Sequence, residues 1–103
     1  MNELVASRSL RFKNRNSNES GELVVEIYKP YLLKEGMVEF PVSVGNAGCS
    51  LRVTGLDTER YNDEIYGMDS LQAISMAVDV EGILKKISET YELFFQDGDP
   101  YFE

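Results

Sequence analysis

The stretch Ile65-Tyr66-Gly67-Met68-Asp69-Ser70-Leu71-Gln72-Ala73 decides the fold, because it marks where a strand-rich part of the chain gives way to a helix. Asp69 is a good N-cap, since its carboxylate can accept a hydrogen bond from the free amides of the first turn. Gln72, three residues later, completes a capping-box pattern. We therefore expect Gly67, Asp69 and Gln72 to form a structural turn and helix cap. An anion site at this helix start is disfavoured, because the Asp69 carboxylate would repel the anion.

After this cap, apolar residues recur at spacings of three and four, as they do on one face of a helix. They are Ala73, Ala77, Val80, Leu84, Ile87, Tyr91 and Phe94, with Leu71, Ile74 and Val78 widening the stripe. The pattern predicts one long helix from Asp69 to about Phe94.

Four segments before the helix alternate apolar and polar residues, which is the period of a strand with one buried face. They lie at residues 4–13, 22–28, 38–44 and 49–54, and polar, turn-rich connections join them. Pro41 indicates an irregularity within the third strand. We predict a single α+β domain over residues 1–103, with two layers. A four-stranded antiparallel meander sheet is covered on one face by one long C-terminal helix (ββββα).

The composition excludes several classes of chemistry. The chain has 103 residues, 10 Lys and Arg against 18 Asp and Glu, and a net charge of −8, which argues against a nucleic-acid partner. Histidine is absent, so a Ser-His-Asp or Cys-His site is impossible within the chain. One cysteine, Cys49, cannot supply the ligands of a zinc site. We therefore expect no enzyme activity, no cofactor and no metal.

The chain has no apolar run near the roughly 18 residues that a membrane span requires. Its N-terminus lacks the basic start and apolar block of a secretory signal. A single cysteine also gives no internal disulfide. These features predict a cytoplasmic protein with no membrane contact.

The helix opening carries a family resemblance. Gly67, Asp69, Ser70, Leu71, Gln72 and Ala73 match a Gly-x-Asp-Ser-Leu-Gln-Ala-Leu motif, with Ile74 in place of the last leucine. In this respect the chain resembles a family of small, functionally uncharacterised bacterial proteins, which have several short strands followed by a helix. The segment Phe40-Pro41-Val42 is similar to an aromatic-x-Pro piece in the third strand of that family. The resemblance implies the fold and no activity.

Several polar groups are candidate sites, each with a structural alternative. Asp57, Glu59, Asp63 and Glu64 share one segment and are candidates for a hard cation, but they lack calcium-loop spacing, so a solvated loop is favoured. Asp97-Gly98-Asp99 is interpreted in the same way, as a turn. Cys49 is expected to be a buried small side chain. Four tyrosines could line a small pocket together with Arg52 or Arg60, but packing at the rim of the sheet is favoured for them. They are Tyr28, Tyr31, Tyr61 and Tyr66.

The predicted helix is longer than the predicted sheet. A helix from Asp69 to Phe94 would be roughly 39 Å long, whereas strands of seven or eight residues span about 25 Å. Its aromatic end should therefore overhang and pack on a second subunit, unless the tail folds back on its own sheet edge. The expected interaction surface is Tyr91, Phe94, Phe95, Tyr101 and Phe102.

Three functions follow from these features. The first is a non-catalytic protein-interaction module, acting as a homodimer or as an assembly component. The second is an immunity or antitoxin-like protein whose acidic surface neutralises a basic toxin. The third is a binder of a small molecule or metal that uses carboxylates.

Overall fold

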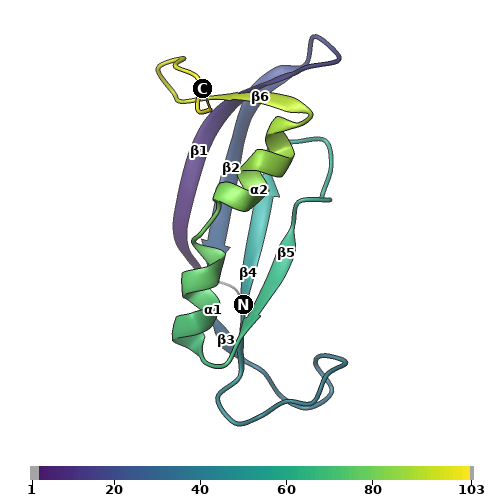
Figure 1. The fold of residues 1–103 in the computed structure, drawn as a ribbon, viewed down its shortest axis with the longest axis vertical. Coiled ribbons are helices and arrows are strands. Elements are labelled where there is room, and N and C mark those ends of the chain that lie inside the picture. The colour runs from purple at the N-terminus through teal and green to yellow at the C-terminus, as the bar shows by residue number, and fades with distance from the viewer. Residues whose placement is uncertain (1–2, 103) are drawn as a thin grey trace.

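The computed structural model describes residues 3–102; residues 1–2 and 103 of the predicted domain lie outside this range. The chain order is β1 (Leu4–Asn14), β2 (Ser20–Tyr28), β3 (Tyr31–Leu32), β4 (Ala47–Thr54), β5 (Asp63–Gly67), α1 (Ser70–Ala77), α2 (Glu81–Ser88) and β6 (Tyr91–Phe94). Figure 1 shows an elongated molecule, with extents of 47 × 25 × 23 Å. The prediction of an α+β fold with an antiparallel sheet is confirmed.

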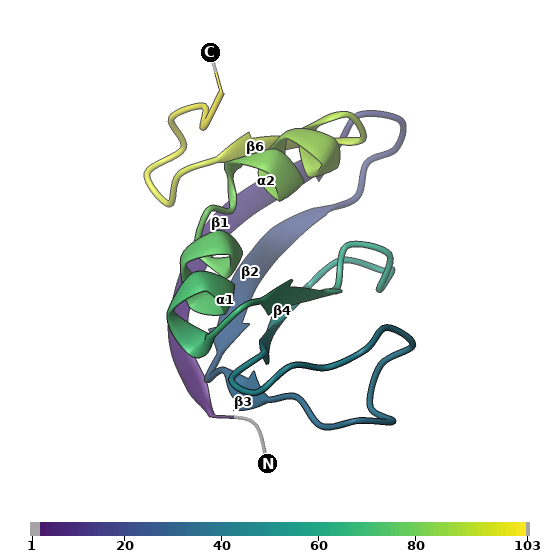
Figure 2. The ribbon, with the colours of Figure 1, turned by 60° about the horizontal axis from the view of Figure 1, so that its bottom comes forward.

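The sheet has six strands rather than the predicted four, and it is not a simple meander. Its order is β3-β4-β2-β1-β6, with β5 paired to β4, and every pairing is antiparallel. Both β2 and the short β3 pair with β4, so β3 takes up the pairing beyond the end of β2. The two helices lie along one face of this curved sheet (Figure 2).

The predicted third strand, residues 38–44, is wrong. The chain from Leu33 to Asn46 has no regular secondary structure, and β2 pairs directly with β4. The segment alternates apolar and polar residues but has no neighbouring strand, because sheet pairing depends on distant partners as well as on local pattern. Its Val44 side chain is fully exposed.

The predicted single long helix is also wrong in its length. The helix breaks between Ala77 and Glu81 and ends at Ser88. Two β-branched residues of low helix propensity, Val78 and Val80, lie at the break. There the amide of Val80 donates to the carbonyl of Val78 over 3.0 Å. Two short helices can follow the curvature of the sheet better than one straight helix.

The residues expected to end that helix form β6 instead. Tyr91 and Leu93 are buried and alternate with the half-buried Glu92 and Phe94, which is the period of a strand. The strand pairs with the C-terminal part of β1, from Arg11 to Asn14. So short an apolar segment fits the residue spacing of a helix as well as that of a strand. It forms a strand here because it pairs with the edge of β1.

The core lies between the sheet and the helices. The predicted helix stripe is confirmed for Ala73, Ala77, Val80, Leu84 and Ile87, all buried, whereas Leu71 and Val78 are exposed. The sheet contributes the alternate residues of its inner face: Leu10, Phe12, Leu23, Val25, Ile27, Cys49, Leu51 and Val53. No helix in residues 3–102 has the length and apolar character needed to cross a membrane.

Candidate functional site

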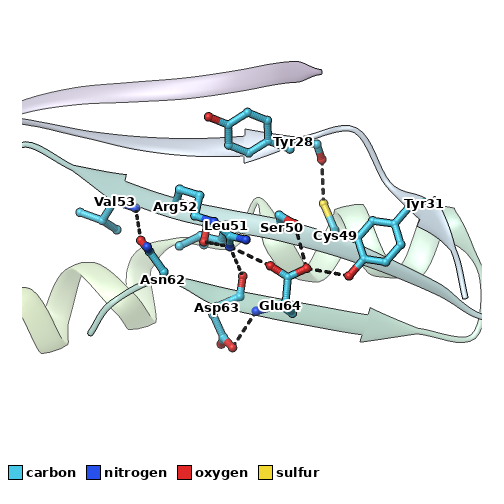
Figure 3. Close-up of polar contacts among 10 residues, drawn as sticks. All are labelled: Tyr28, Tyr31, Cys49, Ser50, Leu51, Arg52, Val53, Asn62, Asp63 and Glu64. Carbon is cyan, nitrogen blue, oxygen red and sulfur yellow. Dashed lines mark hydrogen bonds and ion pairs between the residues drawn. The ribbon is translucent and has the colours of Figure 1, made fainter. Parts of the chain in front are cut away.

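The most connected polar group on the outer face of the sheet is the carboxylate of Glu64 on β5 (Figure 3). Its Oε1 accepts hydrogen bonds from the hydroxyl of Tyr31 over 2.6 Å and from that of Ser50 over 2.8 Å. Its Oε2 lies 2.7 Å from Nη1 of Arg52. We call Tyr31, Ser50, Arg52 and Glu64 the Glu64 cluster.

The pairing of three strands assembles this cluster. Ser50 and Arg52 are alternate residues of β4 and therefore project from the same face. Glu64 lies opposite Ser50 in the register of β5, and Tyr31 of β3 lies opposite Gly48. The residues are distant in the sequence, and the sheet register brings them together.

The ion pair in the cluster has a particular geometry. Nη1 of Arg52 donates to the carbonyl oxygens of Leu51 and Asp63, at 3.0 and 3.2 Å. Oε2 of Glu64 has no hydrogen-bond donor among the described residues, although it is buried. The Arg52 guanidinium therefore pairs with the Glu64 carboxylate while it also donates to two backbone carbonyls.

Protonation of the cluster follows from these contacts. Burial alone would raise the pKa of Glu64, but the hydrogen bonds from Tyr31 and Ser50 and the charge of Arg52 outweigh it and lower that pKa. Burial, followed by the bond to Glu64, raises the pKa of the Tyr31 hydroxyl. At neutral pH the cluster is a carboxylate compensated by a guanidinium, with a tyrosine held as a donor. Such an arrangement ties β3, β4 and β5 together.

The structure brings together part of the predicted tyrosine group. Tyr28, Tyr66 and Arg52 line one shallow, open groove on the outer face, beside Glu26 and Glu64. Tyr61 does not belong to it. That ring is buried in the core, and the guanidinium carbon of Arg60 lies 5.2 Å from its centre.

The other predicted polar candidates lie apart from one another. Asp63 and Glu64 belong to β5, whereas Asp57 and Glu59 lie in the preceding connection. Among residues 3–102 no three acidic or cysteine side chains converge on a metal position. Asp97 accepts from the amide of Asp99 over 2.9 Å in a turn. Cys49 is buried, and its thiol lies 3.1 Å from the carbonyl oxygen of Tyr28.

The start of α1 has the predicted N-cap hydrogen bond. Asp69 is the N-cap of α1, and its Oδ1 accepts from the amide of Gln72 over 2.8 Å. The side chain of Gln72 returns a bond, accepting from the amide of Met68 over 2.6 Å. A β-carbon on Gly67 would lie 2.6 Å from the amide nitrogen of Ala73, so only glycine fits this turn unchanged. All three residues serve the entry into α1.

The helix that was expected to carry the C-terminal aromatic residues past the sheet ends earlier, at Ser88. The tail folds back: Phe94 bridges Pro100, and the amide of Tyr101 donates to the carbonyl of Leu93 over 2.9 Å. Tyr91 is buried.

The hydroxyl of Tyr101 accepts from Arg8 and contacts the carboxylate of Glu81, each over 2.7 Å. The rings of Phe95 and Phe102 pack against the Tyr101 ring at 5.0 and 4.9 Å. Of the predicted interaction surface, Tyr91 is buried, Phe94, Tyr101 and Phe102 are half-buried, and Phe95 is exposed. Its role in association stays a prediction.

Several residues with exposed large apolar side chains belong instead to the segments at the opposite end of the molecule, which is at the bottom of Figure 1. There β3, the irregular segment 33–46, the end of β5 and the start of α1 meet: Leu32 and Gly67 both pair with Ala47. The Phe40 ring packs on Tyr66 at 5.4 Å. We call the exposed large apolar residues here the apolar end: Leu32, Met37, Phe40, Val44, Tyr66, Met68 and Leu71.

Sequence reasoning missed this surface because it placed Phe40 and Val44 in a buried strand and Leu71 in the helix stripe. The chain as a whole matches no protein-family model, no curated protein and no solved structure. The family suggested by Gly67 to Ala73 therefore stays a prediction.

Proposed function

We propose that this chain is a non-catalytic protein-interaction module that forms a homodimer through its apolar end. The observation that carries the proposal is the exposure there: Met68 and Leu71 are each 74% exposed and Leu32 is 65% exposed. Large apolar side chains gathered at one end of a molecule and left in water mark a docking surface.

The area of the apolar end suits a dimer contact. A fully exposed large apolar side chain offers roughly 150–250 Å², so the exposed parts of these residues amount to on the order of 800 Å². Each partner contributes about 800 Å² to an interface of standard size. The summed exposed area of these seven residues is therefore of the order of one partner's share of such an interface.

The distribution of charge favours a second copy at this end. A net charge of −8 on each chain opposes association by most surfaces. Close in sequence to the apolar end, Lys29 and Lys34 reduce the charge of Glu35, Glu39 and Asp69 from −3 to −1. An end-to-end contact between molecules 47 Å long also keeps most of their carboxylates farther apart than a screening length of about 8 Å.

Two variants and one control test the proposal by sedimentation equilibrium. Met68→Asp and Val44→Asp place a charge in the apolar end, and each should weaken the dimer at least tenfold. Phe95→Asp is the matched control: it changes a half-exposed aromatic at the other end of the molecule. It should leave the dimer constant within twofold.

The opposite pattern would overturn the proposal. If Phe95→Asp abolishes association while Met68→Asp does not, the C-terminal aromatic residues form the interface. If the wild-type chain stays monomeric and binds only a basic protein partner, the homodimer is wrong.

A further inference from the structure

Two parts of the chain have strand character without a strand partner. The first is residues 38–44, whose apolar residues Val38, Phe40, Val42 and Val44 alternate with polar ones and with Pro41. In the described structure the backbone amides of Val38, Phe40 and Val44 find no hydrogen-bond acceptor. The segment has the sequence of a strand and lies in a loop.

The second part is one edge of β1. From Arg11 onward β1 pairs with β6, but from Leu4 to Leu10 it pairs only with β2 among the described residues. The side chains from Leu4 to Ser9 are all exposed, with Leu4 49% and Val5 43% exposed. An edge of this kind presents free amide and carbonyl groups, which favours the addition of another strand.

We propose that residues 38–44 of one copy add as a strand to the open edge of β1, Leu4–Leu10, of a second copy. This inference rests on the homodimer proposed above and adds to it a second contact, between residues 38–44 and the β1 edge. The donor and the acceptor belong to the same chain and have equal length, so a two-fold dimer satisfies both edges reciprocally. Both also lie toward the half of the molecule that contains the apolar end.

An apolar groove beside the β1 edge accepts the donor side chains. It runs between the edge and the break that separates α1 from α2, and its lining is Ala6, Ser7, Arg8, Val25, Ile27, Val78 and Val80. Val78 is 49% exposed at this break. The added strand would place its apolar face, which carries Phe40 and Val42, toward this groove and thereby cover Val78.

The remaining donor residues fit the geometry of an edge strand. Proline has no amide and is tolerated where its nitrogen faces solvent. If Pro41 faces outward, then Val38, Phe40, Val42 and Val44 direct their amides to β1, because this direction alternates along a strand. The amide of Val42, which donates to Glu35 over 2.8 Å in the monomer, exchanges that acceptor for β1. Glu39 then lies on the outer face, where the polar residues of the acceptor stretch are Ser7 and Ser9.

Residue-resolved amide hydrogen exchange tests this arrangement in the full-length wild-type chain. Measurements are made at a concentration where sedimentation gives monomer and at one where it gives dimer. The amides of Phe40 and Val44 should exchange at least tenfold more slowly in the dimer, as should alternate amides between Ala6 and Leu10, where the register of β1 is regular. The amide of Glu39, which faces outward, serves as an internal control and should change less than twofold.

A variant pair tests the groove. Val78→Asp should weaken the dimer at least tenfold, because Val78 lines the groove although it lies outside the apolar end. Met76→Asp changes a residue of similar exposure on α1 that does not line the groove. It should leave the dimer unchanged.

The outcomes separate the two proposals. Strand addition is overturned if amide hydrogen exchange at Phe40 and Val44 is the same in monomer and dimer and Val78→Asp has no effect on the dimer. If Met68→Asp still weakens that dimer, the contact through the apolar end stands. A chain that is monomeric at every concentration overturns both.

Discussion

The ring of Tyr31 occupies the space that a side chain at position 48 would need: a β-carbon on Gly48 would lie 2.5 Å from Cζ of Tyr31. From this position the Tyr31 hydroxyl reaches Glu64 over 2.6 Å. The two-residue strand β3 thus gains a side-chain tie across β4 to β5. The position of the Tyr31 ring therefore explains both its close approach to Gly48 and its hydrogen bond to Glu64.

Gly48→Ala should destabilise the fold by about 1–3 kcal/mol, the range for overpacking a well-packed site. The added methyl group displaces the Tyr31 ring and so weakens its bond to Glu64. Chemical denaturation followed by circular dichroism measures the change in the free energy of unfolding. In a Tyr31→Ala background the same substitution should cost less than about 0.5 kcal/mol, since the obstructing ring is gone. Equal costs in both backgrounds would contradict the coupling.

Glu64→Gln should reduce the free energy of unfolding at pH 7 by about 1 kcal/mol, because a charge-assisted pair becomes neutral. The pKa of Glu64 is lowered in the folded state, so its stabilising contribution is complete above about pH 4.3, the ordinary unfolded value. It is lost as the pH falls through the folded pKa. Urea titrations of both proteins from pH 7 to pH 3 should therefore converge at the acidic end. A difference that stays constant with pH would show that the charge of Glu64 does not contribute.

Gly82→Ala should raise the free energy of unfolding by about 0.5–1 kcal/mol, the usual gain for alanine over glycine in a helix. A β-carbon at this position in α2 meets nothing within 4 Å, so no clash offsets the gain. Thermal unfolding measures the change. An unchanged or lower melting temperature would mean that Gly82 has a packing role.

The sequence predicts the strands whose apolar residues face the helices. Alternation locates β1, β2 and β4 because Leu10, Leu23 and Leu51 and their neighbours are buried on one side. Cap chemistry locates the start of α1, since the Asp69 carboxylate bonds an amide only three residues away. These features are local, and local patterns are what a single sequence records best.

Features that depend on distant partners are not predictable in this way. Residues 38–44 and β6 have comparable strand alternation, yet only β6 finds an edge, at Arg11 to Asn14 of β1. The Glu64 cluster requires the register that sets Ser50 opposite Glu64. The polar face of β4 was evident from Ser50 and Arg52, but nothing in the sequence identified β5 as its neighbour.

The solution mass of the wild-type chain tests the central claim most directly. Light scattering across a concentration series, at physiological salt, should show the mass rising from 11.7 kDa toward twice that value and no further. Adding Met68→Asp should return the mass to 11.7 kDa at the same concentrations. A wild-type mass that stays at 11.7 kDa up to the solubility limit would contradict the homodimer.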